Sequence, residues 1–265
     1  QYRIALGLPD PEAAAGGNAA NGVVALTADG GGVTVVGTMG SASIDFNGKV
    51  ATAFGRGMCA YVAYFNYLLA PMSGTCLCGY SPDTVATAAA ATHVGSVVVV
   101  MRSTAMEGVS SSLRMTLPSD KYKQWHTFVA VVQAGADVNG TVRWYTAEDT
   151  ANVIVTAAVT LCGDVRGTVM AGRIDGPGWV NFGGRVGYVQ GPATFVVRVN
   201  AQMLAEAYYP YVTAGAGTVT AVALARDASG SGVWLCAQAR GAVTTTLGAT
   251  TAGAKLDELY VRFDG

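Results

Sequence analysis

The sequence predicts an all-β protein built from two consecutive β-sandwich domains. Its apolar runs are short, rich in Val, Thr and aromatic residues, and regularly separated by glycine-bearing turns. The segment SSLRMTL (111–117) alternates small or polar residues with apolar ones, the period-two pattern of a half-buried strand. The chain changes character after Leu161, where GDVRG follows a long strand. A length of 265 residues exceeds the usual size of one β-domain, so we expect a domain boundary at 162–167.

The beginning of the chain is expected to contain an arm followed by a hairpin. Residues 1–20 begin with a short apolar stretch, which is followed by prolines and small residues. This pattern is typical either of a mobile terminus or of an extended segment that docks on a neighbouring subunit. Within residues 22–48, the runs VVALTA and VTVVGTM flank the turn sequence DGGG at hairpin spacing.

The next hundred positions are expected to mix strands with two short helices. Residues 49–60 are interpreted as a short helix, and 61–72 as an aromatic, apolar strand that stops at Pro71. The Ala-rich segment 86–95 is interpreted as a second short helix. Its neighbour 96–104 has a continuous β-branched run, which is typical of a fully buried strand.

The segment from residue 109 to 161 is predicted to form strands and turns of the structural framework, without a catalytic motif. SSLRMTL ends at Pro118, WHTFVAVVQ (125–133) is a β-branched and aromatic strand, and Asn139-Gly140 supplies a turn. A long strand then follows, interrupted by the polar AEDT. Beyond residue 167 the expected strands are TVMAGRI, WVNFGGRVGYVQ, TFVVRVNAQ, AYYPYVT, GTVTAVALARD, GVWLCAQAR, AVTTTLGAT and KLDELYVRF.

Composition favours association over charge-driven binding. Hydrophobic residues make up 51% of the chain and charged residues only 12%, which is low for a soluble monomer. The net charge of −1 gives no global attraction to nucleic acid or to an anionic membrane. The longest apolar run, at 94–101, is too short to span a bilayer, and no signal peptide is expected at the start.

The cysteines are interpreted as buried small hydrophobic residues. An odd, scattered set is not a disulfide framework, and Cys76 and Cys78 would face the same side of a strand. With two histidines in the chain, zinc binding is disfavoured, and a redox or metal role is the alternative. The five positions are Cys59, Cys76, Cys78, Cys162 and Cys236.

No pattern in the sequence predicts catalysis, and we expect no enzymatic activity. GxSxG is absent, His93 and His126 have no evident partners, and the glycine-rich runs do not lead from a strand into a helix. Glu148 and Asp149 are the most suggestive carboxylates, but adjacent residues on a strand point to opposite faces. The carboxylates considered for glycoside cleavage are Glu107, Glu148, Asp149 and Glu206.

An ordered series of motifs covers residues 55–161. It comprises GRGMCAYVAYFNYLLAP, SGTCLCG, YSPD (80–83), LRMTLPSDKYK (113–123) and the run FVAVVQAGADVNG with the strand that follows it. In this order the motifs resemble the shell domain of tombusvirus-like capsid proteins of small icosahedral RNA viruses. GPATFVVRV (191–199) resembles a strand of the projecting domain that such proteins often carry after the shell.

The resemblance implies an N-terminal arm at 1–20, an eight-stranded jelly-roll shell domain at 21–162 and a smaller projecting β-sandwich at 167–265. It implies a structural capsid protein located in the virion, which self-assembles into an icosahedral shell enclosing the RNA genome. The expected partners are many copies of the same chain and viral RNA, with no membrane. The family binds its genome through a basic arm, whereas residues 1–20 carry only Arg3 as a base, so RNA contact is expected through an arm that this sequence lacks.

The resemblance also indicates a calcium site between subunits. The family has an acidic corner that binds calcium, and Asp83 and Asp120 occupy the matching positions, with Asp137 and Asn139 as additions. Calcium takes six or more oxygen ligands, so a neighbouring subunit would have to contribute. The alternative is that Asp83 and Asp120 are ordinary turn residues that bond their own backbone.

Three basic residues surround the same corner. In the shell interpretation Arg114, Lys121 and Lys123 face the interior RNA or a subunit contact. The alternative is a solvated polar corner that opposes misassembly.

Two other functions stay open. YKQWHTFVAVVQAGADVNGTVRWY (122–145) and GWVNFGGRVGYVQ (178–190) resemble strands of laminin-G or legume-lectin sandwiches, which would imply a secreted, monomeric carbohydrate-binding module. The third interpretation is a filament-forming surface subunit in which residues 1–8 are donated as a strand to a neighbour.

Overall fold

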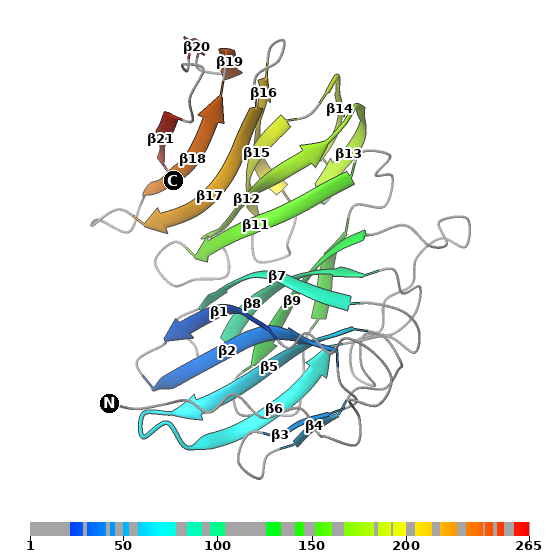
Figure 1. Ribbon diagram of the computed structural model, residues 1–265, viewed down its shortest axis with the longest axis vertical. Helices are drawn as coiled ribbons and strands as arrows, with labels where there is room; N and C mark the ends of the chain where they lie inside the picture. The colour runs from blue at the N-terminus through cyan, green and yellow to red at the C-terminus, as the bar shows by residue number, and fades with distance from the viewer. Residues whose placement is uncertain are drawn as a thin grey trace. The chain divides into compact units, whose positions relative to one another are not determined.

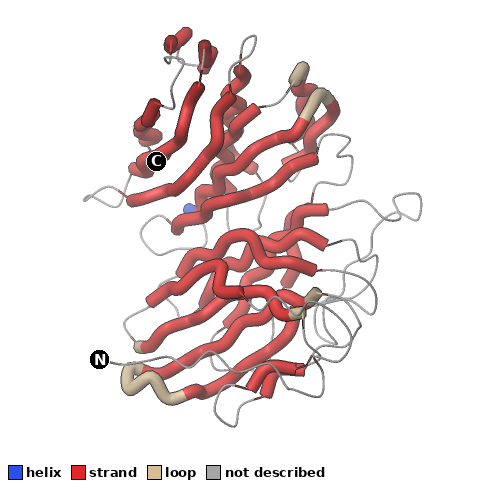
Figure 2. Tube along the Cα trace, viewed as in Figure 1, coloured by secondary structure: helices blue, strands red, loops and turns tan. Residues whose placement is uncertain are grey.

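The computed structural model describes the strands and a few of their connections. The residues described are 22–28, 31–40, 43–45, 50–52, 58–77, 84–91, 96–103, 126–133, 141–145, 152–160, 167–182, 185–191, 193–199, 205–213, 218–226, 232–240, 242–245, 248–251 and 257–264. Within these ranges the chain is almost entirely β-strand and contains no α-helix (Figure 2). The prediction of an all-β protein is therefore confirmed.

The chain divides into two compact units, residues 1–142 and 143–265. In unit 1, one sheet has the strand order β1-β2-β5-β6 (Figure 1), with the bounds Gly22–Ala28, Gly32–Met39, Cys59–Asn66 and Pro71–Leu77. A second sheet has the order β10-β9-β8-β7, with the bounds Thr141–Tyr145, His126–Gln133, Ser96–Ser103 and Thr84–Ala91. A short antiparallel pair completes the described part of this unit, β3 (Ser43–Asp45) and β4 (Val50–Thr52).

Strand β7 connects the two sheets of unit 1. It contacts β1, β2 and β5, and the backbone N–H of Ala86 donates to Thr38 Oγ1 at 3.0 Å. The N–H of Thr84 donates to the carbonyl oxygen of Met58 at 2.8 Å. These bonds satisfy backbone groups of β7 where one sheet lies against the other. The even-numbered positions of β2 therefore face the second sheet.

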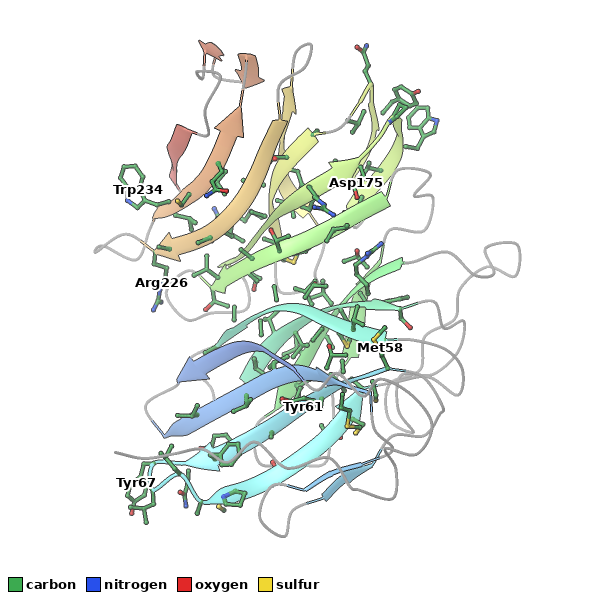
Figure 3. The ribbon with its side chains drawn as sticks, in the orientation of Figure 1. Met58, Tyr61, Tyr67, Asp175, Arg226 and Trp234 are labelled. Carbon is green, nitrogen blue, oxygen red and sulfur yellow. The ribbon has the colours of Figure 1, made fainter. Side chains whose placement is uncertain are left out.

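The core of unit 1 fills both faces of its central strands. A buried cluster lies on the odd-numbered face of β2 and β5, and Figure 3 shows Tyr61 inside the unit. In the other sheet, β8 is fully buried from Val97 to Met101, as its continuous β-branched run predicts. The hydroxyls of Thr84 and Ser103, directly opposite each other, share a buried hydrogen bond of 2.8 Å. The first cluster comprises Val35, Met39, Cys59, Tyr61, Ala63, Phe65 and Cys76.

The two helix predictions in unit 1 are wrong where the structure describes them. The Ala-rich segment begins with β7, in which buried and half-buried residues alternate strictly from Thr84 to Ala91. Pairing with β8 outweighs the helix propensity of alanine, which is only a weak prior. Residues 50–52 form β4 and Cys59 begins β5, so the expected helix at 49–60 is replaced at both ends by strand; residues 53–57 lie outside the described ranges.

Strand order in unit 1 follows the chain. β1 pairs with β2, β5 with β6 and β7 with β8, so the hairpin predicted around DGGG is confirmed. Among the described strands, neighbours in each sheet thus come in the order in which they occur along the chain. A jelly roll instead contains two Greek keys, in which a long connection brings the fourth strand back beside the first.

Unit 2 also contains two principal sheets. The larger has the order β11-β12-β15-β16-β19-β20, with the bounds Asn152–Thr160, Thr168–Asp175, Ala193–Val199, Ala205–Thr213, Ala242–Thr245 and Gly248–Thr251. The smaller has the order β17-β18-β21, with the bounds Thr218–Arg226, Gly232–Arg240 and Asp257–Asp264. β17 contacts β11, β12 and β15, so the two sheets pack as a sandwich around residues such as Phe195 and Leu235.

The larger sheet of unit 2 begins with a strand that precedes the sequence-based boundary at 162–167. β11 pairs with β12 from Asn152 to Thr160, with a bulge between Val155 and Ala157. Gly172 lies opposite Val155, and a Cβ there would overlap the Ile154 carbonyl oxygen and lie 2.8 Å from Cα of Val155. Only glycine permits this close approach of the two backbones.

A separate hairpin belongs to unit 2. The run WVNFGGRVGYVQ forms two strands, β13 (Gly178–Phe182) and β14 (Arg185–Val189), where the sequence suggested one. It follows β12 through a turn in which Gly176 has a φ of 118°, a conformation that favours glycine. Val180 and Val189 are buried on one face of this hairpin, and the other face is exposed.

Candidate interaction surface

Among the described residues of unit 1, the large apolar side chains that are exposed lie in the turn after β5 and at the start of β6. The side chains of Tyr67, Leu68 and Met72 are 77%, 67% and 49% exposed. Figure 3 shows Tyr67 at the end of the β5–β6 hairpin, pointing away from the sheet. We call residues 67–72 the apolar turn. Large apolar side chains that protrude together are typical of surfaces that contact another molecule.

Asn66 holds the apolar turn in one conformation. Its side-chain Oδ1 accepts hydrogen bonds from the backbone N–H groups of Leu68 and Ala70, both at 3.0 Å. The N–H of Leu69 donates to the Asn66 carbonyl oxygen at 2.8 Å, and the N–H of Asn66 to the Ala70 carbonyl oxygen at 3.0 Å. Leu69 adopts a φ of 60°, which is uncommon for a residue with a side chain. These four bonds keep the turn ordered while its side chains face solvent.

The apolar turn is well suited to leave water. Residues 58–77 contain no charged side chain, and the N–H groups of Asn66, Leu68, Leu69 and Ala70 are already bonded within the turn. Removing water from the turn therefore leaves few polar groups without a hydrogen bond. Such unsatisfied groups would otherwise oppose burial. Burying a large apolar side chain completely contributes about 1.5–3 kcal/mol. The turn can thus insert into an apolar recess of a partner at little polar cost.

The sequence did not predict this turn. Residues 61–72 were expected to form one strand ending at Pro71, but β5 ends at Asn66 and Pro71 begins β6. The expectation of a single strand is wrong because the Asn66 side chain offers the backbone a tight turn in place of continued strand pairing. Asn66, together with a proline at the first position of a strand, was the available signal.

Unit 2 exposes aromatic side chains on strand faces. Trp179 and Tyr188 are directly opposite each other on β13 and β14, 50% and 57% exposed, with ring centroids 5.4 Å apart and planes at 73°. Trp234, near the start of β18 in the smaller sheet, is 42% exposed, and Figure 3 shows its side chain beside that strand. Edge-to-face geometry is favourable for aromatic pairs.

Charge contributes little to these surfaces. Arg173 Nε lies 3.1 Å from Asp175 Oδ1 on β12, and both side chains are more than two-fifths exposed. Solvent screening leaves such a pair worth at most about 1 kcal/mol.

The cysteines differ in their chemistry. Cys59 is disulfide-bonded, so the expectation that all five cysteines are unpaired is wrong. Cys76 and Cys236 are free. Burial of the Cys76 thiol raises its pKa to about 12, so it stays protonated and unreactive near neutral pH. Burial likewise raises the pKa of Tyr61.

The site residues named from the sequence lie outside the part of the chain that the structure describes. This applies to the acidic positions Asp83, Asp120 and Asp137 and to the basic positions Arg114, Lys121 and Lys123. Calcium binding and RNA contact there stay predictions. Among the residues described, no three His, Cys, Asp or Glu side chains are grouped as metal ligands would be. The described ranges also include no helix long and apolar enough to cross a membrane.

Comparison with known proteins does not identify a family. No protein-family model matches the chain, and no curated protein matches it significantly.

Proposed function

We propose that this chain is a structural coat subunit that self-assembles into an icosahedral virus shell around an RNA genome. The observation that carries the proposal is the apolar turn, whose exposed Tyr67 and Leu68 are held rigidly in a stretch without charge. A subunit of a closed shell must bury apolar surface against copies of itself, and like charges facing across a symmetry axis would oppose that contact.

Composition supports the same function. Only 12% of residues are charged, so little of the surface is protected against association by charge. Within the proposal, unit 1 forms the continuous shell and unit 2 projects from it. Among the described strands, the two sheets built on unit 1 contain eight, counting β10, which crosses the unit boundary; this is the number in a jelly roll, although the neighbours follow chain order. An experimental structure of the shell would decide between a jelly roll and a sandwich of two meanders.

Calcium and RNA belong to the proposal as further partners. Asp83, Asp120 and Asp137 would supply carboxylate oxygens at a contact between subunits, and a neighbour would complete the coordination. Arg114, Lys121 and Lys123 would face the genome or an adjacent subunit. Titration of assembled particles with EDTA tests the first point, since particles held by calcium swell or dissociate when it is removed.

The decisive experiment compares the native chain with a variant of the apolar turn. We expect the 27.0 kDa chain to sediment as large particles that are spherical in negative stain. The double variant Tyr67→Ser/Leu68→Ser should remain as small soluble species. Because both side chains are exposed, its free energy of unfolding should change by no more than about 0.5 kcal/mol for each substitution.

The matched control replaces an exposed aromatic residue of unit 2. Trp234→Ser removes a comparably large apolar side chain and should leave particle formation intact. A native chain that sediments as a monomer at neutral pH would exclude the coat function. Assembly of the double variant into normal particles would show that the apolar turn is not the subunit contact.

A further inference from the structure

The outer face of the β13–β14 hairpin presents two aromatic rings in a fixed arrangement. Trp179 and Tyr188 are cross-strand neighbours in edge-to-face contact, and each ring remains about half exposed. Val180 and Val189, the next residues along each strand, are buried. Side chains alternate between the faces of a strand, so the buried valines anchor the hairpin while the rings point to solvent. The rings are therefore organised before any ligand arrives.

Two exposed residues without charge flank this pair in the sequence. Pro177 precedes β13 and Gln190 follows β14, and both are exposed. An amide offers both donors and an acceptor, which suits hydroxyl groups. A sugar ring combines an apolar C–H face, which packs on an aromatic ring, with a rim of hydroxyls. Pockets that combine aromatic side chains with a few polar groups are typical of small-molecule recognition.

We propose that the Trp179–Tyr188 pair is a binding site for a neutral pyranose glycan. This inference goes beyond the proposed coat function, because it assigns unit 2 a role in attachment to a carbohydrate-bearing surface. One ring would pack on the C–H face of the sugar, and the other, at 73° to it, would form the side of the site. Gln190 would bond the hydroxyls.

Size and charge favour a sugar over other ligands. A stable protein interface buries at least about 1,000 Å² in total, whereas the exposed apolar side chains that the structure describes on this hairpin are two half-exposed rings and one proline. None of the four exposed residues Pro177, Trp179, Tyr188 and Gln190 is charged, so the surface gives no complement to a phosphate backbone. One or two sugar rings match what these side chains offer.

The test titrates the full chain with defined sugars. Lactose, maltose and chitobiose serve as neutral probes, and binding is followed by tryptophan fluorescence and by saturation-transfer NMR. We expect at least one of these disaccharides to bind. Trp179→Ala should weaken that binding roughly tenfold or more, and Tyr188→Ala should weaken it as well. Tyr188→Phe, which keeps the ring, should retain most of the affinity.

Two controls separate this site from a general loss of structure and from the coat function. Trp234→Ala removes another exposed tryptophan of unit 2 and should bind the disaccharide as the native chain does. Particle formation of every variant is read in parallel by negative-stain microscopy, so a failure to assemble is scored separately from a failure to bind sugar. If none of the three disaccharides binds, or if Trp179→Ala binds as well as Trp234→Ala, the inference is wrong. A Trp179→Ala variant that alters assembly without affecting sugar binding would also overturn it, by making the pair a contact between copies of the chain.

Discussion

The two units expose apolar residues in different ways. Unit 1 gathers them at one hairpin, where Tyr67 and Leu68 follow the end of β5 and Met72 lies at the start of β6. Unit 2 places them within strands, where the side chains of Trp179, Tyr188 and Trp234 are exposed. A protruding turn fits into a recess, and a flat ring supports a ligand laid across it. Under the two proposals, the same all-β architecture would serve assembly in unit 1 and glycan recognition in unit 2.

The backbone constraints that support these surfaces also differ. In unit 1 an asparagine side chain closes the turn through hydrogen bonds to Leu68 and Ala70. In unit 2 a glycine, Gly172, allows β11 and β12 to approach closely, and β12 leads directly to the aromatic hairpin. Substitutions at these two positions should therefore affect the units separately.

The largest effect is expected at Gly172. In Gly172→Ala the new Cβ would overlap the Ile154 carbonyl oxygen, so the strands must separate, at a cost of about 3 kcal/mol in the free energy of unfolding. Urea denaturation followed by circular dichroism measures this loss, and it should fall on unit 2. Gly191→Ala is the matched control, because nothing lies within 4 Å of its Cβ position. Equal stability of the two variants would contradict the close approach of β11 and β12.

The next effect is expected at Asn66. Asn66→Ala removes the acceptor for two backbone N–H groups, which should lower the free energy of unfolding of unit 1 by about 2 kcal/mol and abolish particle formation. Leu69→Asn is the counterpart, since asparagine tolerates the φ of 60° at this position and should keep the turn intact. Sedimentation velocity and urea denaturation report both results. Normal particles from Asn66→Ala would show that the turn does not need its side-chain bonds.

Much of the fold could be predicted because strand signals are local. β8 and β9 follow from their β-branched runs, and the β1–β2 hairpin from its glycine-rich turn. The helix prediction for the Ala-rich segment was wrong because its strand conformation is imposed by pairing with β8, a contact that the local sequence does not encode. The exposed aromatic pair could not be predicted either, since WVNFGGRVGYVQ shows an apolar pattern but not which of its faces is buried.

The candidate site was missed for a related reason. Apolar residues in a run such as YVAYFNYLLAPM are expected to be buried, and nothing in their hydropathy distinguishes Phe65, which is buried, from Leu68, which is exposed. The distinction comes from Asn66, whose side chain ends the strand. Likewise, cysteine spacing alone did not reveal that Cys59 is disulfide-bonded.

A third effect should appear at alkaline pH in unit 1. The folded pKa of Cys76 is raised from its ordinary value of 9.0 to about 12, so the stabilisation linked to the protonated thiol is complete below pH 9 and is lost as the pH rises towards 12. At pH 10 the linkage amounts to about 1.4 kcal/mol. Urea denaturation between pH 7.5 and pH 10 measures the decline, and Cys76→Ala should remove it.

Cys236 in unit 2 is less buried than Cys76, so iodoacetamide should label Cys236 first in the folded protein. Faster labelling of Cys76 would contradict its burial.

The smallest effect is expected at the exposed ion pair of β12. Arg173→Gln breaks the contact with Asp175 close to the aromatic hairpin in sequence, yet both side chains are well exposed. The free energy of unfolding should fall by less than about 1 kcal/mol, and the affinity for a neutral disaccharide should stay unchanged. Urea denaturation at low and high salt checks the first part, since added salt screens an exposed pair and the small difference should shrink at high salt. A change in sugar affinity comparable to that of Trp179→Ala would mean that charge shapes the recognition face of unit 2, and would remove the contrast drawn with the uncharged turn of unit 1.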